Sequence, residues 1–297
     1  MKRIIAISLG ALMLLPLVSC RRDDMSPEEA RAALRQEVTF TATMDGYEQV
    51  KSTDLSFEDG DVIGIYAQQP FDVVNVKATV KGSAVKPLAP FEWELVRTAV
   101  FFAYYPFNVS YGEDPRMSFS VRSDQRTYDA YQASDLRGAV ALGRNGETVE
   151  LPFKHMLSKL TVMVSCEDKA EQVTSVTLGG VAQTVSADFS VPSVETAGGR
   201  GDLKAGKAVS GNGNEGFVAI LAPQTLTELP VIVTTSKGQS LVFEPEKPLT
   251  FASGHAYATS TLTVPKQSAQ GPKLTFTVSV TDWGDGGSMD FHRGKQN

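Results

Sequence analysis

Histidine and cysteine are scarce in this chain of 297 residues, which contains three histidines and two cysteines. His155, His255 and His292 lie far apart, without the i, i+4 or HExxH spacing that is typical of a zinc site. The sequence also lacks a GxSxG motif, a P-loop and a dinucleotide-binding fingerprint. We therefore expect no catalytic residue, no metal site and no cofactor.

Basic charge is also in short supply, with 28 Lys and Arg residues against 34 Asp and Glu residues and a net charge of −6. Proteins that bind nucleic acid need a basic face that displaces counterions from the phosphates. The acidic balance excludes nucleic acid as an expected partner.

Long apolar runs are absent apart from residues 4–18, a stretch of about 15 residues that is shorter than the roughly 18 to 20 needed for a membrane-spanning helix. Lys2 and Arg3 precede this run, as in the basic start of a secretory leader. The pattern predicts a signal peptide over residues 1–19 rather than a retained transmembrane segment.

The leader ends in Leu17-Val18-Ser19-Cys20, which resembles the lipobox of bacterial lipoproteins. This resemblance implies cleavage before Cys20 and acylation of its sulfur and its new amino group, which together anchor stably in a membrane. With Cys20 committed to lipid, Cys166 has no partner for an intrachain disulfide, and we expect it to pack as a small apolar group. The following residues 21–24, RRDD, are either a solvated linker or a tag for display on the cell surface.

A short helix is predicted over residues 26–35, where Ser26 is placed as the cap, Pro27 suits the first turn and Glu29 completes a capping box. We assign residues 20–36 to a lipidated linker that contains this helix.

Short alternating runs replace the helical period from residue 37 onward. In VTFTAT, for example, Val38, Phe40 and Ala42 share one face, as in a half-buried strand. About fourteen or fifteen such runs, separated by turn formers such as Asp59-Gly60, predict an all-β fold. We expect two tandem β-sandwich domains, at 37–156 and 157–297, joined near LPFKHMLSKL.

Several acidic and aromatic residues invite a functional interpretation. Asp282, Asp285 and Asp290 lie in a glycine-rich stretch, but their spacing is not that of an EF-hand and favours a plain turn. Residues 200–202 spell Arg-Gly-Asp, which we interpret as a chance tripeptide in a glycine-rich loop. Trp93 and Trp283 are expected in the core, although tryptophans also stack on sugars.

A series of motifs follows in order along the mature chain: FEDGDVIGIYA at 57–67, FFAYYPF at 101–107, DLRGAVA at 135–141, LPFKHMLSKLTVMV at 151–164, AILAPQT at 219–225, FASGHAYATSTLTV at 251–264 and VSVTDWGDGG at 278–287. Together with the lipobox, this series resembles the fimbrillin-like lipoprotein family, the subunits of type V pili. The resemblance implies two transthyretin-like β-sandwich domains, no catalysis, and a role in a fimbria or in surface adhesion. It also implies other fimbrial subunits as partners and a lipid-anchored position at the outer membrane, on the cell surface or in the fimbrium.

In polymerising members of that family, an arginine-specific protease removes an N-terminal segment that includes the first strand, and a strand from a neighbour fills the groove by β-strand addition. Arg31 and Arg35 are the candidate processing sites in this sequence. Cleavage there releases the lipid but leaves VTFTAT in place, so the role as shaft, tip or anchor stays open.

The candidate assembly strand is near the C-terminus, where four apolar residues alternate with small polar ones: Leu274, Phe276, Val278 and Val280. Such a strand fits either the edge of its own sandwich or an open groove in a neighbour. We expect self-pairing because Trp283 follows at once, and we keep exchange as the functional alternative.

The alternative function is a surface glycan-binding lipoprotein of a nutrient-uptake system, with host or bacterial surface glycans or proteins as ligands. A glycan binder exposes two or three aromatic residues on one face. The exposure of Trp93, Trp283, Tyr128 and Tyr131 therefore separates the two hypotheses.

Overall fold

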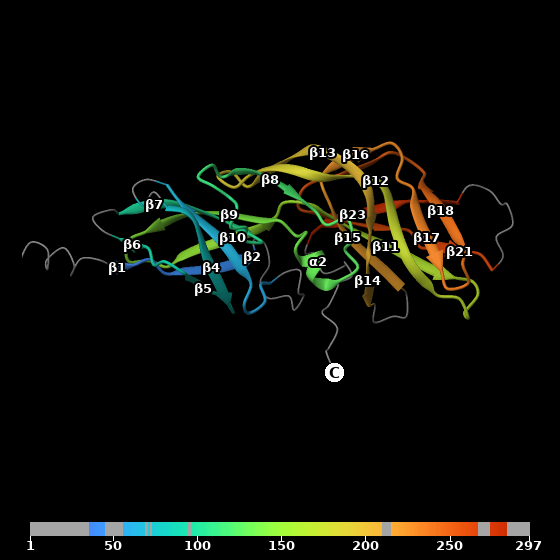
Figure 1. The fold of residues 1–297 in the computed structure, drawn as a ribbon, viewed down its shortest axis with the longest axis horizontal. Helices are drawn as coiled ribbons and strands as arrows, with labels where there is room; N and C mark the ends of the chain where they lie inside the picture. Colours follow the sequence, from blue (N-terminus) through green and yellow to red (C-terminus); the bar gives the residue numbers. More distant parts are fainter. Residues whose placement is uncertain are drawn as a thin grey trace, which may run out of the picture.

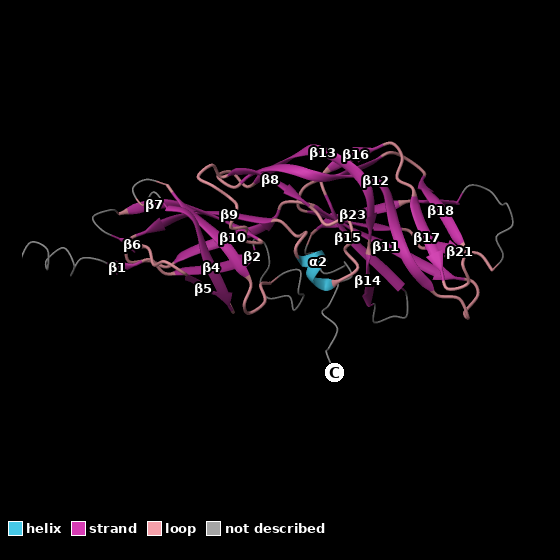
Figure 2. Ribbon diagram, in the orientation of Figure 1, coloured by secondary structure: helices cyan, strands magenta, loops and turns pink. Residues whose placement is uncertain are grey.

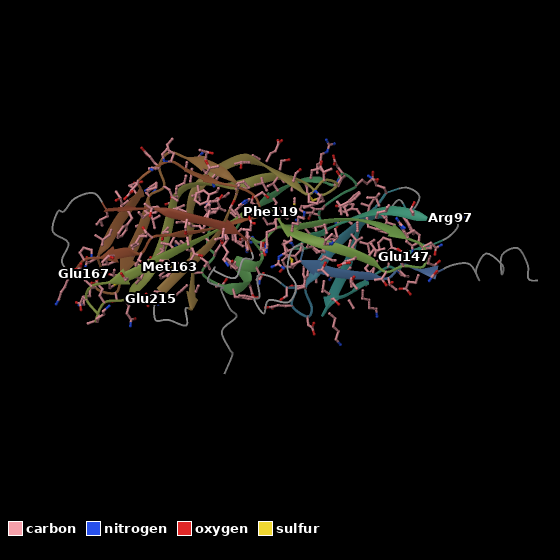
Figure 3. All side chains as sticks on the ribbon, turned by 180° about the vertical axis from the view of Figure 1, so that it is seen from behind. Arg97, Phe119, Glu147, Met163, Glu167 and Glu215 are labelled. Carbon is pink, nitrogen blue, oxygen red and sulfur yellow. The ribbon has the colours of Figure 1, made fainter. Side chains whose placement is uncertain are left out.

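The computed structural model describes residues 36–44, 56–68, 71, 73–93, 97–209, 215–266 and 274–283, and these residues are almost entirely strands and turns. The described part contains 23 strands and one short helix, α2 (Tyr128–Gln132). The molecule is elongated, with Arg97 and Glu147 at one end and Glu167 and Glu215 at the other (Figures 1, 2 and 3). Within the described residues, no helix is long and apolar enough to cross a membrane.

Seven strands near the N-terminus form a closed barrel: β2 (Phe40–Met44), β3 (Val62–Ala67), β4 (Val73–Lys81), β5 (Ala84–Pro87), β7 (Thr98–Tyr105), β9 (Arg137–Arg144) and β10 (Val149–His155). A short pair, β1 (Gln36–Glu37) and β6 (Glu92–Trp93), extends one end of the barrel. Val38, Phe40 and Ala42 are all buried, which confirms the predicted face of the first strand. The barrel core also contains several aromatic residues, and Phe40 makes edge-to-face contacts with Phe91 and Phe101.

The barrel differs from the sandwich that we expected for this half. Phe40 pairs in parallel with Val149, and this register continues through Met44 and Phe153. The pairing joins two strands more than one hundred residues apart and leaves the sheet without a free edge. Alternation within a single strand reveals which face is buried but not which strand closes the sheet.

The later strands form two sheets that enclose a second core. One sheet contains β11 (Ser158–Cys166), β14 (Gly206–Val209), β15 (Glu215–Leu221), β20 (His255–Thr259), β21 (Leu262–Val264) and β23 (Val278–Asp282). The other contains β8 (Arg116–Ser120), β12 (Val173–Asp188), β13 (Ser193–Lys204), β17 (Val231–Thr235), β18 (Ser240–Pro245) and β22 (Leu274–Phe276). A separate pair, β16 (Gln224–Leu226) and β19 (Leu249–Phe251), completes the described strands.

The two halves of the fold share chain segments. Strand β10 ends at His155 and β11 begins at Ser158, close to the expected division at residue 156. Strand β8 nevertheless precedes this point and pairs with β12 in the later sheet, and Phe119 of β8 and Tyr131 of α2 are buried in the later core. The long β12–β13 hairpin reaches back over the barrel, where Phe189 stacks on Tyr104 with ring centroids 4.6 Å apart. The number of separable domains stays a prediction.

Candidate functional site

A buried ion pair lies where the barrel meets the sandwich. Asp135, just before β9, accepts hydrogen bonds from Nε of Arg137 at 2.7 Å and from its Nη2 at 2.6 Å. The other carboxylate oxygen accepts from Nδ1 of His155 at 2.7 Å. Arg137 is only 1% exposed, so the three side chains form a charged cluster sealed from water.

Trp283, the last residue that the structure describes, covers this cluster. Its indole ring lies parallel to the imidazole of His155, with ring centroids 3.9 Å apart and planes 1° from parallel. The backbone N–H of Trp283 donates to the carbonyl of Gly254 at 3.0 Å, and the N–H of Gly254 donates to Leu157 at 2.8 Å. Four motifs that are distant in sequence, DLRG, FKHM, SGH and TDW, therefore meet at one point.

The guanidinium of Arg137 also reaches into the barrel. Its Nη1 donates to the carbonyl of Ser56 at 3.2 Å, and its Cζ lies 5.2 Å from the ring centroid of Phe57 and 5.1 Å from that of Tyr105. A guanidinium between two aromatic rings gains cation–π attraction in addition to its ion pair. Arg137 thus connects the 56–61 loop to the junction.

The charges in this cluster stabilise one another. Burial on its own raises the pKa of the Asp135 carboxyl, but the charges of Arg137 and His155 and their hydrogen bonds outweigh burial and lower its pKa to about 2. Nearby Asp61 has a raised pKa because burial outweighs the backbone hydrogen bond and the attraction of Arg137. Both carboxylate oxygens of Asp135 are therefore occupied by buried partners, and the cluster links β9, β10 and the residue that follows β23.

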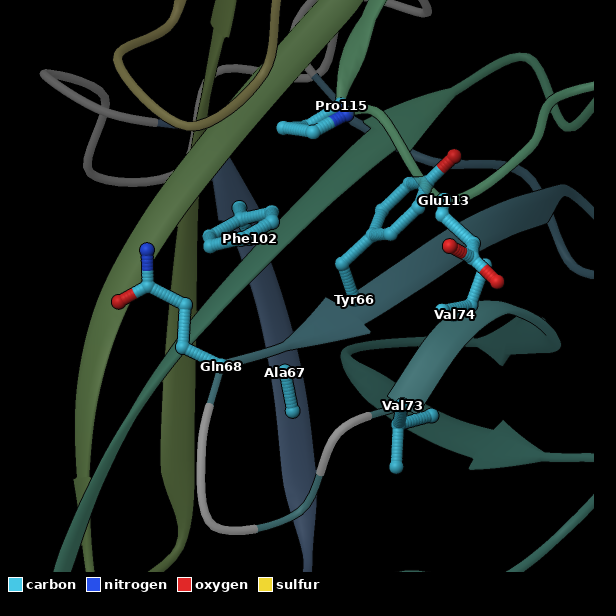
Figure 4. Close-up of a pocket in the computed structure, with 8 residues that line it drawn as sticks. All are labelled: Tyr66, Ala67, Gln68, Val73, Val74, Phe102, Glu113 and Pro115. Carbon is cyan, nitrogen blue, oxygen red and sulfur yellow. The ribbon is translucent and has the colours of Figure 1, made fainter.

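A groove of about 710 Å³ lies on the outer face of the barrel (Figure 4). Tyr66 and Phe102, from paired strands β3 and β7, stack with ring centroids 5.8 Å apart, and Pro115 and Val74 lie beside them. Glu113 lies at the side of Tyr66 and Val74, in the loop that leads to β8.

The position of this loop is fixed by hydrogen bonds. The hydroxyl of Tyr66 donates to the carbonyl of Gly112 at 3.1 Å. Burial raises the pKa of Tyr66 to about 12, so the hydroxyl keeps its proton at neutral pH. Asn75 reinforces the loop, since its Nδ2 donates to the carbonyls of Asn108 and Tyr111, both at 2.9 Å.

A β-bulge interrupts the β3–β4 pairing beside the groove. The register shifts between Ile65 and Ala67, and Asn75 adopts a positive φ of 46°. This left-handed conformation is uncommon outside glycine and persists where surrounding contacts hold it. Tyr104 supplies such a contact, because its hydroxyl donates to Oδ1 of Asn75 at 2.6 Å. The bulge turns Val74 outward, where it is 40% exposed.

The predicted assembly strand is divided between the two sheets. β22 pairs in parallel with β18, and β23 pairs antiparallel with β20, so this segment is the edge strand of both sheets. Phe276 is buried, Leu274 and Val278 are half-buried, and Val280 is 56% exposed. The expected single apolar face is therefore interrupted, because the chain changes sheets at Thr277.

Several predicted residues lie outside the described part of the chain. These are Cys20, Arg31, Arg35, Asp285, Asp290 and His292, together with the helix expected over 26–35. Among the described residues, no group of three or more His, Cys, Asp or Glu side chains is placed to hold a metal ion. Cys166 is half-buried, and burial raises the pKa of its thiol.

The aromatic residues chosen as a test of glycan binding are all buried: Trp93, Trp283, Tyr128 and Tyr131. They therefore form no exposed platform. Arg200 and Asp202 lie in strand β13, not in the loop we expected, because residues 193–204 pair with β12. Arg200 donates to the carbonyl of Gly180 at 3.0 Å, and Asp202 accepts from the N–H of the same residue at 3.3 Å.

The sequence analysis named DLRGAVA as a family motif but did not predict that Asp135 and Arg137 form a buried ion pair. A signal was present, because two opposite charges two residues apart stand beside an apolar strand. Residues spaced by two point to the same face of a strand. Charges that point toward a core are rarely found unless they are paired. The groove residues gave no comparable signal, since Tyr66, Phe102 and Glu113 come from separate segments.

The fold and the buried junction define a protein scaffold built from β-strands, in which the contacts at the junction are structural. The chain belongs to the fimbrillin-like family, whose model matches residues 49–283. This assignment confirms the family expected from the motifs and supports a structural subunit of a fimbria.

Solved structures share the fold. A protein from Bacteroides uniformis, provisionally described as a cell adhesion protein, has a TM-score of 0.63 at 19% identity and covers 83% of this chain and 98% of its own. A second, from Bacteroides ovatus and described in the same way, has a TM-score of 0.61 at 15% identity and covers 83% and 96%. No curated protein matches the chain.

Proposed function

We propose that this protein is a non-catalytic structural and adhesive subunit of a fimbria, or of a pilus-like assembly, held at the outer membrane through lipid on Cys20. The observation that carries the proposal is the fimbrillin-like match over residues 49–283. The closed barrel and the buried junction support it, because both are extensively paired structural features of the described residues.

The N-terminal strand bears on how the subunit is processed. The sequence has no arginine between Arg35 and Arg97, and β2 is part of the barrel wall. An arginine-specific protease that cuts at Arg31 or Arg35 frees the chain from its lipid and leaves β1 and β2 in place. We infer that the subunit keeps its own first strand after processing.

The C-terminal strand is the candidate for β-strand addition to a neighbour. Its outer edge is unpaired among the described strands, which is the property that strand addition uses. Phe276 and Trp283 are buried at either end of the segment and favour self-pairing. Deletion of residues 272–297 tests this: self-pairing predicts a sandwich that misfolds or aggregates. A soluble, folded protein that has lost only assembly supports exchange instead.

Electron microscopy of cells with and without the gene tests the function itself. We expect surface fibres that carry the protein, detected by immunogold labelling, to be lost or shortened in the deletion strain and restored by the wild-type gene. Fibres that are unchanged in number, length and composition contradict the proposal.

A further inference from the structure

Strand β8, in the middle of the molecule, has one edge that is unpaired among the described strands (Figure 1). Its other edge pairs with β12, and the N–H of Val121, just after β8, continues this ladder by donating to the carbonyl of Gln183 at 2.9 Å. The odd-numbered residues of β8 therefore direct their backbone groups toward β12. Because successive residues of a strand direct these groups to opposite sides, Ser118 and Ser120 direct theirs to the unpaired edge.

This edge lacks the features that protect sheet edges from other chains. Strand β13, on the other side of β12, has two register shifts and glycines in the left-handed region at Gly198 and Gly199, and such bulges hinder further pairing. Strand β8 pairs without a register shift and contains no lysine. Among the described residues, the N–H of Ser118 and both backbone groups of Ser120 have no hydrogen-bond partner. The edge of β8 is therefore open to an additional strand.

A hollow of about 480 Å³ lies beside this edge. Its lining includes Ser118, Ser120 and Arg122 of the edge, together with Phe107 and Tyr111 of the loop that precedes β8. The hydroxyl of Tyr111 donates to the carbonyl of Ser118 at 3.3 Å, which holds the loop beside the strand. From Ser118 to Arg122 the edge is about 13 Å long at about 3.3 Å per residue, so it suits one extended segment of about five residues.

Arg122 gives the hollow a positive charge. Its side chain is exposed and makes no ion pair or hydrogen bond with any described residue, while its backbone N–H donates to Oγ of Ser134 at 2.9 Å. Nearby Asp124 is already paired with Arg126 at 2.5 Å. The chain as a whole has a net charge of −6, so attraction of an acidic ligand is local to this position. Phe119 is only 8% exposed and adds little apolar surface, so binding depends on backbone hydrogen bonds and charge.

We propose that the free edge of β8 binds an extended acidic segment of a partner protein by β-strand addition. Backbone hydrogen bonds to Ser118 and Ser120 supply affinity, and an acidic side chain opposite Arg122 supplies specificity. In an antiparallel pairing, the residues opposite these three lie on the exposed face, and the two residues between them face Phe107 and Phe119. The bound segment therefore alternates acidic and apolar residues. The inference goes beyond the proposed function and does not depend on it.

A peptide of this pattern, acetyl-Glu-Val-Glu-Val-Glu with a dye at its C-terminus, is the probe. Fluorescence polarisation measures its binding to the whole chain from residue 20, with Cys20→Ser to remove the predicted lipid site. We expect saturable binding with a Kd below about 1 mM. The peptide acetyl-Lys-Val-Lys-Val-Lys should bind at least about tenfold more weakly, because like charges then face Arg122.

Two variants separate the charge from the backbone hydrogen bonds. Arg122→Glu should weaken binding of the glutamate peptide at least about tenfold and reverse the preference between the two peptides. Ser120→Pro should weaken binding at least about fivefold, because proline removes an N–H of the free edge while the neighbouring residues keep their bonds to β12. Ser120→Ala keeps this N–H and should bind within about twofold of the parent, although it loses the hydroxyl contact with Thr184 at 2.8 Å.

A glutamate peptide methylated at its glutamate nitrogens tests the same hydrogen bonds on the unaltered protein, and it should bind at least about tenfold more weakly. Arg97→Glu is the matched control for charge, because it makes the same change at the exposed end of the barrel, and it should leave binding unchanged (Figure 3). Circular dichroism of every variant verifies the fold.

Three results overturn the inference. The first is the absence of saturable binding of the glutamate peptide up to about 1 mM, the weakest class of affinity. The second is equal binding of the lysine peptide or the methylated peptide, or equal weakening by Arg97→Glu and Arg122→Glu. The third is self-association of the chain that the peptide displaces, which assigns the edge to a second copy instead of a separate partner.

Discussion

Trp283 stacks face to face on His155, and this contact joins the end of the last described strand to the end of the barrel strand β10. His155 in turn donates to Asp135, which binds Arg137. In the sequence, His155 is one of three distant histidines and Trp283 is an expected core residue. The structure brings the two side chains together in one structural role.

Replacement of the tryptophan tests whether it holds the last strand. Trp283→Ala should destabilise the protein by about 3–5 kcal/mol, because it removes a large buried side chain and uncovers the charged cluster. Urea unfolding measures the change, and amide exchange should show the greatest loss of protection in β23. Val280→Ala is the control in the same strand: Val280 is 56% exposed, so its loss should cost about 0.5 kcal/mol or less. Equal effects of the two variants contradict the role of Trp283.

The acid dependence of stability tests the charge state of Asp135. Its folded pKa is lowered to about 2, whereas an unfolded aspartate titrates near 3.9. A lowered folded pKa contributes stability that is present above about pH 4 and is lost as the pH falls toward 2. Asp135→Asn should therefore be less stable than wild type at pH 6, and the gap should narrow between pH 4 and pH 2.

Urea unfolding at several pH values measures this gap. Glu147→Gln, at an exposed position, should follow the wild-type curve. A gap that is constant with pH contradicts an ionised Asp135 in the folded protein. The raised pKa of Asp61 acts in the opposite direction, so the comparison uses the difference between wild type and Asp135→Asn rather than either curve alone.

Fragments test whether the chain divides near residue 156. Residues 157–297 lack β8 and α2, so the core would lose Phe119, Tyr131 and Leu136. We expect this fragment to lack a near-UV circular dichroism signal and to aggregate. A longer fragment that begins at residue 108 restores these groups and should be more soluble. A cooperative unfolding transition in the shorter fragment supports the sandwich at 157–297 as an independent unit.

Metabolic labelling tests the anchor at Cys20. An alkyne fatty acid should label the wild-type chain and fail to label Cys20→Ala, because the thiol and the new amino group are the acylation sites. Cys166→Ala is the control and should be labelled as wild type. Equal labelling of wild type and Cys20→Ala contradicts lipidation at this position.

Local patterns predicted the strands well because burial of one face is recorded in the strand itself. Val38, Phe40 and Ala42 alternate with threonine and glutamate side chains, and the structure buries all three. Trp93 and Trp283 are buried as expected, since a large aromatic ring in a β-rich chain gains most from the core.

The partners of the strands could not be predicted in the same way. The parallel pairing of Phe40 with Val149 depends on which distant strand is available, and nothing within either strand encodes that choice. The interruption at Thr277 likewise depends on the edges of two sheets, β18 and β20, which lie on either side. Asp135 and Arg137 carried a local signal, but their partner His155 became evident only in three dimensions.

The interleaving of the two halves also sets an order for folding. The barrel closes only when Val149–His155 has joined Phe40–Met44, and the later sheet needs Arg116–Ser120, which lies between them in the chain. A chain that emerges from its N-terminus cannot close the barrel until His155 is present, and it cannot complete the later sheets until Asp282 is present. Contacts of such long sequence separation slow folding, since loop-closure entropy is lost before the pairing is gained. The folding chain therefore has an extended period with unpaired strand edges, during which it is most exposed to aggregation.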